Sequence, residues 1–371
     1  MRERAIKVVV GMSGGVDSSV ALYLLKEQGY EPVGVSLKYD VWKDPRNECR
    51  ENVCCTKESF TIAKKICKQL GIKHYIVDIS KEFRCQVIDY FIREYKNSRT
   101  PSPCVLCNLN VKFKALIGFA DEIGAKYIAT GHYARIRAVK SSKLKAESFE
   151  LLRAKDKNKD QTYSLCFLNQ AILSRAIFPL GELTKEEVYK IARGREGFEV
   201  FGKRKQSQDF CFVSGKSLNL MLEKEIGAKR GEIVNEGGKV LGEHKGLHFY
   251  TIGQRKGIDL AGGPYFVIEK NKNTNELVVS ADAKFNARKK ASIFPVRFIS
   301  GSGPSEPIKV VAKLRSTAKP ASAKLVQAKH GYILEFDKPQ MAVTPGQIAV
   351  FYDASGGAGF SEICLGGGVI N

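Results

Sequence analysis

The sequence has no long hydrophobic run, since no apolar stretch approaches the roughly 18 residues needed to span a bilayer. The first residues, Met1 to Ile6, are charged and lead directly into a short apolar segment, which is not typical of a signal peptide. No internal repeat or low-complexity tract stands out. These absences argue against a helical membrane protein, and they predict a cytoplasmic protein without a membrane partner.

Acidic residues are few relative to basic ones. There are 39 Asp and Glu residues against 60 Lys and Arg residues, which gives a formal net charge of +21. Such an excess favours a polyanionic partner, because basic surfaces displace counterions from phosphate backbones. A proteome that is rich in lysine throughout would give the same excess, so the charge suggests nucleic acid without deciding it.

The ten cysteines do not suggest a disulfide framework, because a cytoplasmic compartment is reducing. Cys67, Cys85 and Cys166 lie within apolar helical patterns, and we expect them to be buried small hydrophobic residues. The adjacent pair Cys54 and Cys55 is expected in a loop, with a structural or incidental sulfur-handling role.

The first half of the chain alternates strand and helix patterns, which predicts a parallel sheet covered by helices on both faces. The expected strands are 6–10, 32–37, 74–78 and 126–129, and the expected helices are 18–28, 57–70, 83–95 and 111–123. A capping box from Thr184 to Glu187 begins a later helix. Ligands of such sheets bind beyond the carboxyl ends of the strands.

After about residue 215, short β-rich runs separated by turn signals replace the helical periodicity. A chain of 371 residues with 43% hydrophobic residues is long enough for two or three ordinary globular domains. We therefore expect a catalytic domain over 1–212, a small β-rich domain over 213–285 and a C-terminal β-barrel over 286–371.

A glycine-rich loop, Gly11 to Ser19, follows the first expected strand and begins the first expected helix. Its small residues allow a tight turn whose N–H groups converge on an anion at the positive end of the helix. Asp17 is suited to hold a cation that bridges phosphates. Because the loop has no Lys, it is not a Walker loop. The string SGGVDS resembles the pyrophosphate loop of ATP-pyrophosphatases, which favours adenylation chemistry.

Two cysteines differ from the apolar ones in their surroundings. Pro101 and Pro103 precede Cys107 and discourage helix before it, so Cys107 is expected at or near a helix N-terminus, where the dipole stabilises a thiolate. Cys211 follows the basic cluster 203–205, which also favours a thiolate. Together the two residues are suited to sulfur transfer, in which a persulfide on one cysteine is released by disulfide formation with the other.

Over nearly its whole length the sequence resembles the tRNA-specific 2-thiouridylases (MnmA type) of the PP-loop superfamily. The matching strings are GMSGGVDSSV, RTPSPCVLCN followed by VKF, ATGHYAR, NKDQTYSL, SQDFCF, HKGLHFYTIGQRKG, TPGQIAVFYD and CLGGGVI. The resemblance implies a sheet domain of the adenine nucleotide α-hydrolase type. It also implies that the wobble uridine of tRNA is adenylated at its 2-oxygen with ATP and then thiolated there, releasing AMP and pyrophosphate.

The resemblance also implies roles for individual residues. Cys211 would carry the persulfide and Cys107 would be the second catalytic cysteine. ATP, with Mg²⁺, would be bound by Gly11, Met12, Ser13, Gly14, Gly15, Val16, Asp17, Ser18, Leu37 and Gly131. The target base would lie against Ser102, Pro103 and Cys104, and the tRNA would contact His132, Lys159, Asp160, Gln161, Arg315, Ser316 and Gln347. A sulfur-donor protein, either a cysteine desulfurase or a relay protein, would be a second partner.

The sequence departs from the family pattern at Cys104, where the family commonly has Asp. Cys104, Cys107 and Cys211 could therefore hold a [4Fe-4S] cluster with one iron open for sulfide, as an alternative to the persulfide route. A zinc site is less favoured, because no fourth ligand or second Cys-x-x-Cys is present. Ser316 and Thr317 also stand where the family often has an aromatic residue and an Arg.

Two other classes of function remain open at this point. A PP-loop ligase that joins an amine to an adenylated carbonyl would need no pair of cysteines. A non-enzymatic RNA-binding module would leave the glycine-rich loop without a use.

Overall fold

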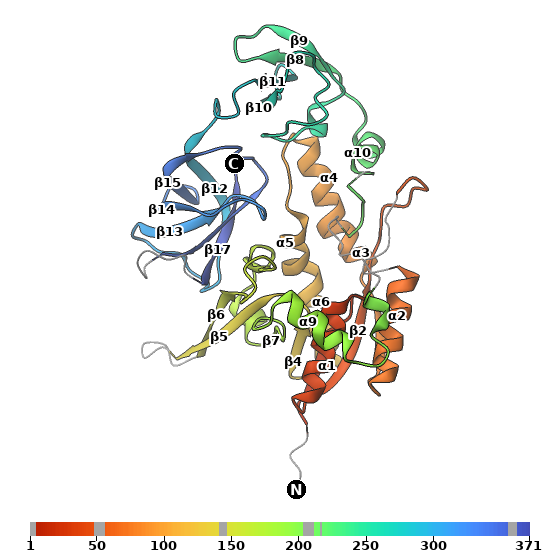
Figure 1. Cartoon of the computed structure of the whole chain (residues 1–371). Helices are drawn as coiled ribbons and strands as arrows, with labels where there is room; N and C mark the ends of the chain where they lie inside the picture. Colours follow the sequence, from red (N-terminus) through yellow and green to blue (C-terminus); the bar gives the residue numbers. More distant parts are fainter. Residues whose placement is uncertain (1–4, 48–55, 141–146, 203–210, 216, 355–361) are drawn as a thin grey trace.

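The computed structural model describes residues 5–47, 56–140, 147–202, 211–215, 217–354 and 362–371. Figure 1 shows a sheet-and-helix part at the bottom right, a small β-rich part at the top and a barrel at the left. The predicted residues 54, 55 and 203–205 lie outside the described residues.

The sheet of the first part has five parallel strands in the order β3-β2-β1-β4-β7. The strands are β1 (Lys7–Gly11), β2 (Glu31–Lys38), β3 (His74–Asp78), β4 (Tyr127–Thr130) and β7 (Ala176–Ile177). The first four lie within one or two residues of the predicted strands. The parallel arrangement confirms the predicted fold class.

Helices cover both faces of this sheet because the side chains of β1 alternate between them. Val8 and Val10 pack in a core with α1 (Val16–Glu27), α2 (Lys57–Gln69) and α9 (Lys185–Arg193). Val9 points to the other face, where α4 (Asp89–Lys96) and α6 (Phe113–Glu122) form a second core.

Two long helical runs on the second face contain π-helical turns. One run joins α3 (Ser80–Phe83), η1 (Arg84–Ile88) and α4. The other joins α5 (Pro103–Cys107), η2 (Asn108–Lys112) and α6, so this helix begins eight residues before the predicted 111–123. Short π-helical turns occur frequently at functional sites.

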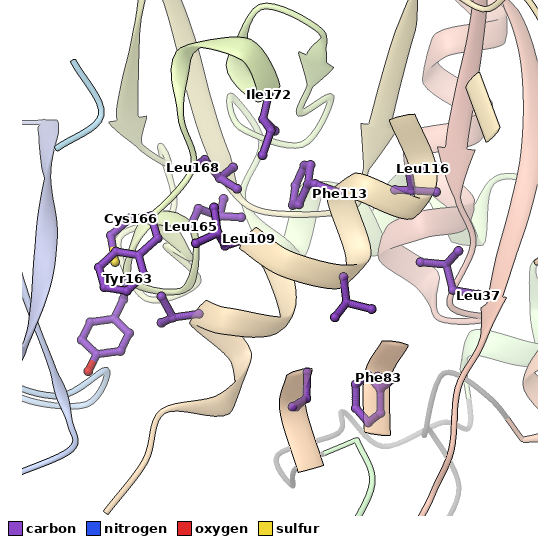
Figure 2. Close-up of a cluster of buried hydrophobic side chains, with 14 of the residues drawn as sticks. Leu37, Phe83, Leu109, Phe113, Leu116, Tyr163, Leu165, Cys166, Leu168 and Ile172 are labelled. Atoms are coloured by element: carbon purple, nitrogen blue, oxygen red, sulfur yellow. The ribbon is translucent and has the colours of Figure 1, made fainter. Parts of the chain in front are cut away.

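The run Pro103–Glu122 is long and apolar enough, by length and composition, to cross a membrane, which the sequence did not lead us to expect. Half of its most apolar window is buried in the protein. Its side chains Leu109, Phe113 and Leu116 lie in the hydrophobic cluster of Figure 2, together with Leu165 and Leu168 from a neighbouring segment. The run is therefore a core helix of this fold.

The central part contains a four-stranded sheet in the order β10-β11-β8-β9. Its strands are β8 (Gly231–Asn235), β9 (Val240–His244), β10 (Phe266–Asn271) and β11 (Glu276–Ser280). This part also contains the helix α10 (Leu218–Ile226), although helical periodicity was expected to vanish after about residue 215. Only two side chains of α10, Met221 and Leu222, are fully buried, which explains why its pattern is weak.

The last part is a closed six-stranded barrel with the strand order β12-β15-β14-β13-β16-β17, in which β17 also pairs with β12. The strands are β12 (Arg288–Phe298), β13 (Ile308–Lys313), β14 (Ala321–Gln327), β15 (Tyr332–Gln340), β16 (Ile348–Asp353) and β17 (Ile363–Ile370). A hairpin of β5 (Ala134–Lys140) and β6 (Glu147–Arg153) continues the barrel sheet through β17, although it lies in the range predicted for the first domain.

The described chain also contains short helices between these larger elements. They are α7 (Thr162–Leu165), α8 (Gln170–Leu173), η3 (Glu199–Gly202) and η4 (Leu247–Phe249).

All three parts meet at Thr100, in the segment that leads into α5. The backbone N–H of Thr100 donates to the carbonyl of Pro345 in the barrel at 2.9 Å, and its hydroxyl lies 3.3 Å from that of Thr251 in the central part. Gln347 Nε2 donates to the carbonyl of Thr100 at 3.0 Å. The start of α5 is therefore held by residues from both β-rich parts.

The apolar cysteines follow the sequence pattern in two cases of three. Cys67 and Cys166 are fully buried, and burial raises the pKa of the Cys67 thiol to about 12. Cys85 is exposed, so its predicted burial is wrong. It lies in η1, two residues after the buried Phe83 and two before the buried Val87, so it stands on the opposite face of the helical run.

Replacing Gly346 by Ala tests how far the meeting point at Thr100 depends on close backbone approach. Gly346 has φ +90°, and a Cβ there would lie 2.9 Å from the nitrogen of Thr100. Gly29 has φ +85° with no atom near the added Cβ, so Gly29→Ala is a matched control for backbone strain alone. We expect Gly29→Ala to lower the free energy of unfolding by about 1 kcal/mol and Gly346→Ala by about 2–3 kcal/mol. Urea unfolding measures both, and equal losses would contradict the proposed close packing.

Candidate active site

A cavity of about 650 Å³ opens at the carboxyl edge of the parallel sheet. Ser13 follows β1, Tyr39 follows β2, and Gly131 to Tyr133 follow β4, and all of these residues line it. The other walls come from α5 and η2, from residues 158–161, from Lys185 on α9, from Cys211, and from Ser316 and Thr317 of the barrel. The cavity therefore lies where ligands of parallel α/β sheets bind.

The glycine-rich loop lies at one end of this cavity, and Ser13, Gly15, Val16 and Asp17 line it. The loop is closed by its own hydroxyls: Ser13 N donates to Ser18 Oγ at 3.2 Å, and Ser18 Oγ donates to the carbonyl of Gly15 at 3.1 Å. The first N–H groups of α1 have no partner within the helix, so they are available to an anion in the cavity.

Glycine is required behind the loop because two backbones approach each other closely. A Cβ on Gly131, just after β4, would lie 2.7 Å from the nitrogen of Ser18. Gly131 thus packs the end of β4 directly against the first turn of α1, and it lines the cavity itself.

Asp17 forms an ion pair with Lys185 at the end of the cavity beside the glycine-rich loop. Its carboxylate oxygens lie 2.6 and 2.7 Å from Lys185 Nζ, and Tyr133 Oη donates to it at 2.8 Å. The Lys185 ammonium also lies over the rings of Tyr133 and Tyr189, at 5.7 and 5.0 Å from their centroids. Burial, followed by the charge of Asp17, raises the pKa of the Tyr133 hydroxyl.

Lys185 is a site residue that the sequence reasoning did not find. The capping box was predicted, and Thr184 Oγ1 does accept from Glu187 N while the Glu187 carboxylate accepts from Thr184 N. This cap makes Lys185 the first residue of α9 and turns it toward the glycine-rich loop. The cation that a Walker loop carries in its own sequence comes here from a distant helix.

Cys104, Cys107 and Cys211 all line the cavity, together with the glycine-rich loop. Cys107 is the last residue of α5, and the helical run continues directly into η2. The predicted place of Cys107 at or near a helix N-terminus is therefore wrong. Pro103 occupies the first turn, as its fixed φ and missing N–H allow, and the helix starts four residues before Cys107. The helix dipole therefore acts mainly on Cys104, since its effect falls off within the first turn.

The three cysteines line one cavity without forming a metal-binding group. Among the described residues, which include all three, no set of three or more His, Cys, Asp or Glu side chains is arranged to hold a metal ion.

His132 is held in the cavity wall by aromatic rings and a hydrogen bond. Its ring stacks on Phe113 at 6.0 Å between centroids and meets the edge of Phe178 at 6.1 Å. Its Nδ1 lies 2.7 Å from Thr130 Oγ1. Burial, followed by the charge of Lys112, lowers the pKa of His132 well below its ordinary value, so the imidazole is neutral at pH 7. Lys112, at the end of η2, lines the same cavity.

The residues predicted to contact tRNA at 159–161 all line the cavity, and they also bond to other parts of the protein. Asp160 accepts from the backbone N of Ala154 at 3.1 Å and from Thr162 Oγ1 at 2.9 Å. Gln161 Oε1 accepts from Tyr133 N at 2.9 Å. Lys159 presents a cation to the same cavity.

Several predicted residues stand behind the cavity wall and do not line it. They are Gly11, Met12, Gly14, Ser18, Leu37, Ser102, Arg315 and Gln347. Met12 and Leu37 are buried in the two cores. Arg315 Nη2 donates to the carbonyl of Ala342 at 3.0 Å, whereas its neighbour Ser316 lines the cavity. Gln347 Oε1 accepts from Ser102 Oγ at 3.4 Å, so both residues support the start of α5.

Comparison with known proteins assigns a family to this arrangement. Three family models match in succession: the tRNA methyl transferase HUP domain over residues 6–215, the tRNA methyl transferase PRC-barrel domain over 219–281 and the aminomethyltransferase beta-barrel domain over 288–370. The tRNA-specific 2-thiouridylase MnmA 1 of Geobacillus kaustophilus is 41% identical over 98% of this chain and 95% of its own length. The chain belongs to the tRNA-specific 2-thiouridylase (MnmA) family.

Other members of this family are similar to the same extent. The tRNA-specific 2-thiouridylase MnmA of Clostridium botulinum is 42% identical over 98% of this chain and 97% of its own length. The MnmA of Roseiflexus sp. is 40% identical over 98% of this chain and 99% of its own length. A solved structure of a 4-thiouridine synthetase–RNA complex with bound ATP matches 59% of this chain and 50% of the synthetase chain. The sequence identity is 19% and the TM-score is 0.34, a likeness too low to carry an inference. The family assignment therefore confirms the resemblance seen in the sequence.

Replacing Lys185 by Met tests its role in this family member. Without the ammonium, the end of the cavity beside the glycine-rich loop loses a cation that would attract the phosphates of ATP, and we expect the Kd for ATP to rise about tenfold or more. Lys190→Met, on the exposed side of the same helix, is the matched control. Isothermal titration with ATP and Mg²⁺ measures both Kd values, and an unchanged Kd for Lys185→Met would show that Lys185 does not act on the nucleotide.

Proposed function

We propose that this chain is a tRNA-uridine 2-sulfurtransferase that adenylates the 2-oxygen of the wobble uridine and then replaces that oxygen by sulfur. The observation that supports it most is that the glycine-rich loop, Cys107 and Cys211, which are far apart in sequence, line one cavity. Neither a PP-loop ligase nor an RNA-binding module would need two cysteines at this place.

In the first step, the 2-oxygen of the uridine attacks the α-phosphate of ATP, pyrophosphate leaves, and the N3 proton of the base is lost. The N–H groups of the loop and of the first turn of α1 would hold the phosphates, and the Lys185 ammonium would neutralise charge on the departing pyrophosphate. Mg²⁺ commonly binds through one or two carboxylates together with phosphates and waters. Asp17 is the carboxylate that lines the cavity beside the loop, so it would be the protein ligand.

In the second step, the terminal sulfur of a persulfide on Cys211 attacks C2 and displaces AMP. The Cys107 thiolate then attacks Cys211 Sγ, which breaks the bond between Cys211 and the transferred sulfur and leaves that sulfur on the base. A Cys107–Cys211 disulfide forms, and a thiol reductant must open it before the next turnover. A sulfur-donor protein, a cysteine desulfurase or a relay protein, would supply the persulfide.

The size and charge of the protein suit a tRNA substrate. The base must leave the anticodon stack to reach a cavity of about 650 Å³, and the net charge of +21 favours binding to the phosphate backbone. Pro103, Cys104, His132, Lys159 and Ser316 line the cavity and would contact the base or its neighbours. Ser102, Arg315 and Gln347 would act from behind the wall. The thiol chemistry fits a reducing cytoplasm.

Replacing each catalytic cysteine tests the proposal. We expect Cys211→Ser to lower thiolation of tRNA at least about a thousandfold, because the nucleophile is lost, while tRNA-dependent release of pyrophosphate from ATP stays largely intact. Cys107→Ser should likewise lower thiolation and leave pyrophosphate release largely intact. Cys85→Ser, outside the cavity, should behave as the unchanged protein. Thiolated uridine is measured by mass spectrometry of digested tRNA. Loss of pyrophosphate release in both variants would mean that the cysteines are structural.

The [4Fe-4S] alternative assigns different work to the same residues and is tested separately. In the persulfide route the three thiols hold no metal, so we expect protein purified without oxygen to carry no stoichiometric iron. Iron and sulfide analysis measures this. About four irons per chain, lost in a Cys104→Ser variant, would replace the persulfide route by the cluster route.

A further inference from the structure

Cys211 is followed by one of the most deeply buried side chains of the protein. Phe212 is 1% exposed, and its ring meets those of Phe91 and Phe83 edge-on, at 5.1 and 6.0 Å between centroids. Cys211 itself is only partly buried and lines the cavity. The aromatic cluster therefore fixes the chain directly after the cysteine, while the thiol faces the site.

The backbone of this segment is held by the loop 39–47, which follows β2. Trp42 N donates to the carbonyl of Phe212 at 3.0 Å, and Asn47 Nδ2 donates to the same carbonyl at 3.3 Å and to the carbonyl of Trp42 at 2.8 Å. On its other side, Asn47 Oδ1 accepts from Ser214 N at 3.3 Å. The amide of Asn47 thus bridges the two segments with both of its polar atoms.

A second contact joins the same two segments farther along. Ser217 Oγ donates to the carbonyl of Arg46 at 2.9 Å, at the start of α10. On α10, Lys224 Nζ lies 3.3 Å from the Asp44 carboxylate. The loop is therefore held at several points against the segment that carries Cys211.

The loop also reaches the cavity where the nucleotide is proposed to bind. Tyr39, its first residue, lines the cavity and stacks on Phe83 at 4.5 Å between centroids. Phe83 in turn contacts Phe212. A continuous set of contacts thus runs from the carboxyl end of β2 to the residue after Cys211.

We propose that Asn47 is a positioning residue that sets the place of the Cys211 sulfur relative to the adenylated base and to Cys107. The proposal rests on the proposed function for its substrate. Sulfur transfer needs the terminal persulfide sulfur over the ring face at C2, and then the Cys107 sulfur in line with the S–S bond of the Cys211 persulfide. Errors of about 1 Å in such geometry cost about a hundredfold in rate. Adenylation uses the glycine-rich loop and does not need this alignment.

The test compares Asn47→Ala with Asn235→Ala. Asn235 also makes two side-chain hydrogen bonds to its own turn, to Gly237 N and Lys239 N, but it lies in the central part. We expect Asn47→Ala to lower the initial rate of tRNA thiolation about tenfold or more while tRNA-dependent pyrophosphate release changes less than about twofold. Asn235→Ala should change neither rate. An equal fall of both rates in Asn47→Ala, or no fall, would overturn the proposal.

A second readout does not depend on the substrate. Oxidation of the purified protein with diamide should form the Cys107–Cys211 disulfide, identified by mass spectrometry of peptides, and Asn47→Ala should slow it about fivefold or more. If the unchanged protein forms this disulfide but thiolates no tRNA, the proposed function fails while the positioning role is still measured. If Asn47→Ala does not fold, Ser217→Ala removes the neighbouring contact instead. We expect Ser217→Ala to lower the thiolation rate by a smaller factor and to leave the rate of pyrophosphate release unchanged. An unchanged disulfide rate in the folded variant would contradict the positioning role.

Discussion

Hydrogen bonds to the segment before α5 hold the three parts of the molecule in one arrangement. Thr100 is bonded to Pro345 and Gln347 of the barrel and lies beside Thr251 of the central part. The helix that starts immediately afterwards carries Cys104 and Cys107 into the cavity. Of these three contacts, only the bond to Pro345 joins two backbones, so substitutions at Gln347 and Thr251 would weaken the junction while the bond to Pro345 remains.

A second bridge ties the sheet part to the barrel through buried polar groups. Tyr163 Oη donates to the carbonyl of Ile348 on β16 at 2.7 Å, and Figure 2 shows this side chain at the edge of the hydrophobic cluster, pointing away from it. Thr162 Oγ1 lies 3.0 Å from the hydroxyl of Tyr352. Both residues follow the 158–161 loop directly. The barrel therefore supports the 158–161 wall of the cavity.

Local patterns predicted four of the five strands of the parallel sheet because each of these four is a short, largely apolar run bounded by Gly or polar residues. The fifth strand, β7, has only two residues and was not predicted. The same patterns missed the pairing of the β5–β6 hairpin with the barrel, since pairing between distant strands leaves no local signal. They also missed α10, which is short and only partly buried. Start positions were less accurate than element types, as the run beginning at Pro103 shows.

In the site, the strings shared with a known family identified the loop and the two cysteines, and the structure brings these together. The place of Cys107 in its helix was predicted wrongly, although Pro103 at the first helical position was the signal that could have given it. Lys185 and Asn47 could not be found from the sequence. Each acts across a large separation in the chain, and the identity of a Lys or Asn says nothing about which loop it will face.

The pairing of β17 with β12, β16 and β6 has a consequence for the order in which the molecule can assemble. Cys364 on β17 pairs with Leu151 on β6, although more than half of the chain lies between them. During synthesis, the β5–β6 hairpin leaves the ribosome long before β17 has been made, so the edge of β6 that pairs with β17 stays unpaired until then. Contacts of such separation make folding slow and leave strand edges exposed to other chains. The junction of the sheet part with the barrel therefore closes only when the last strand has been made.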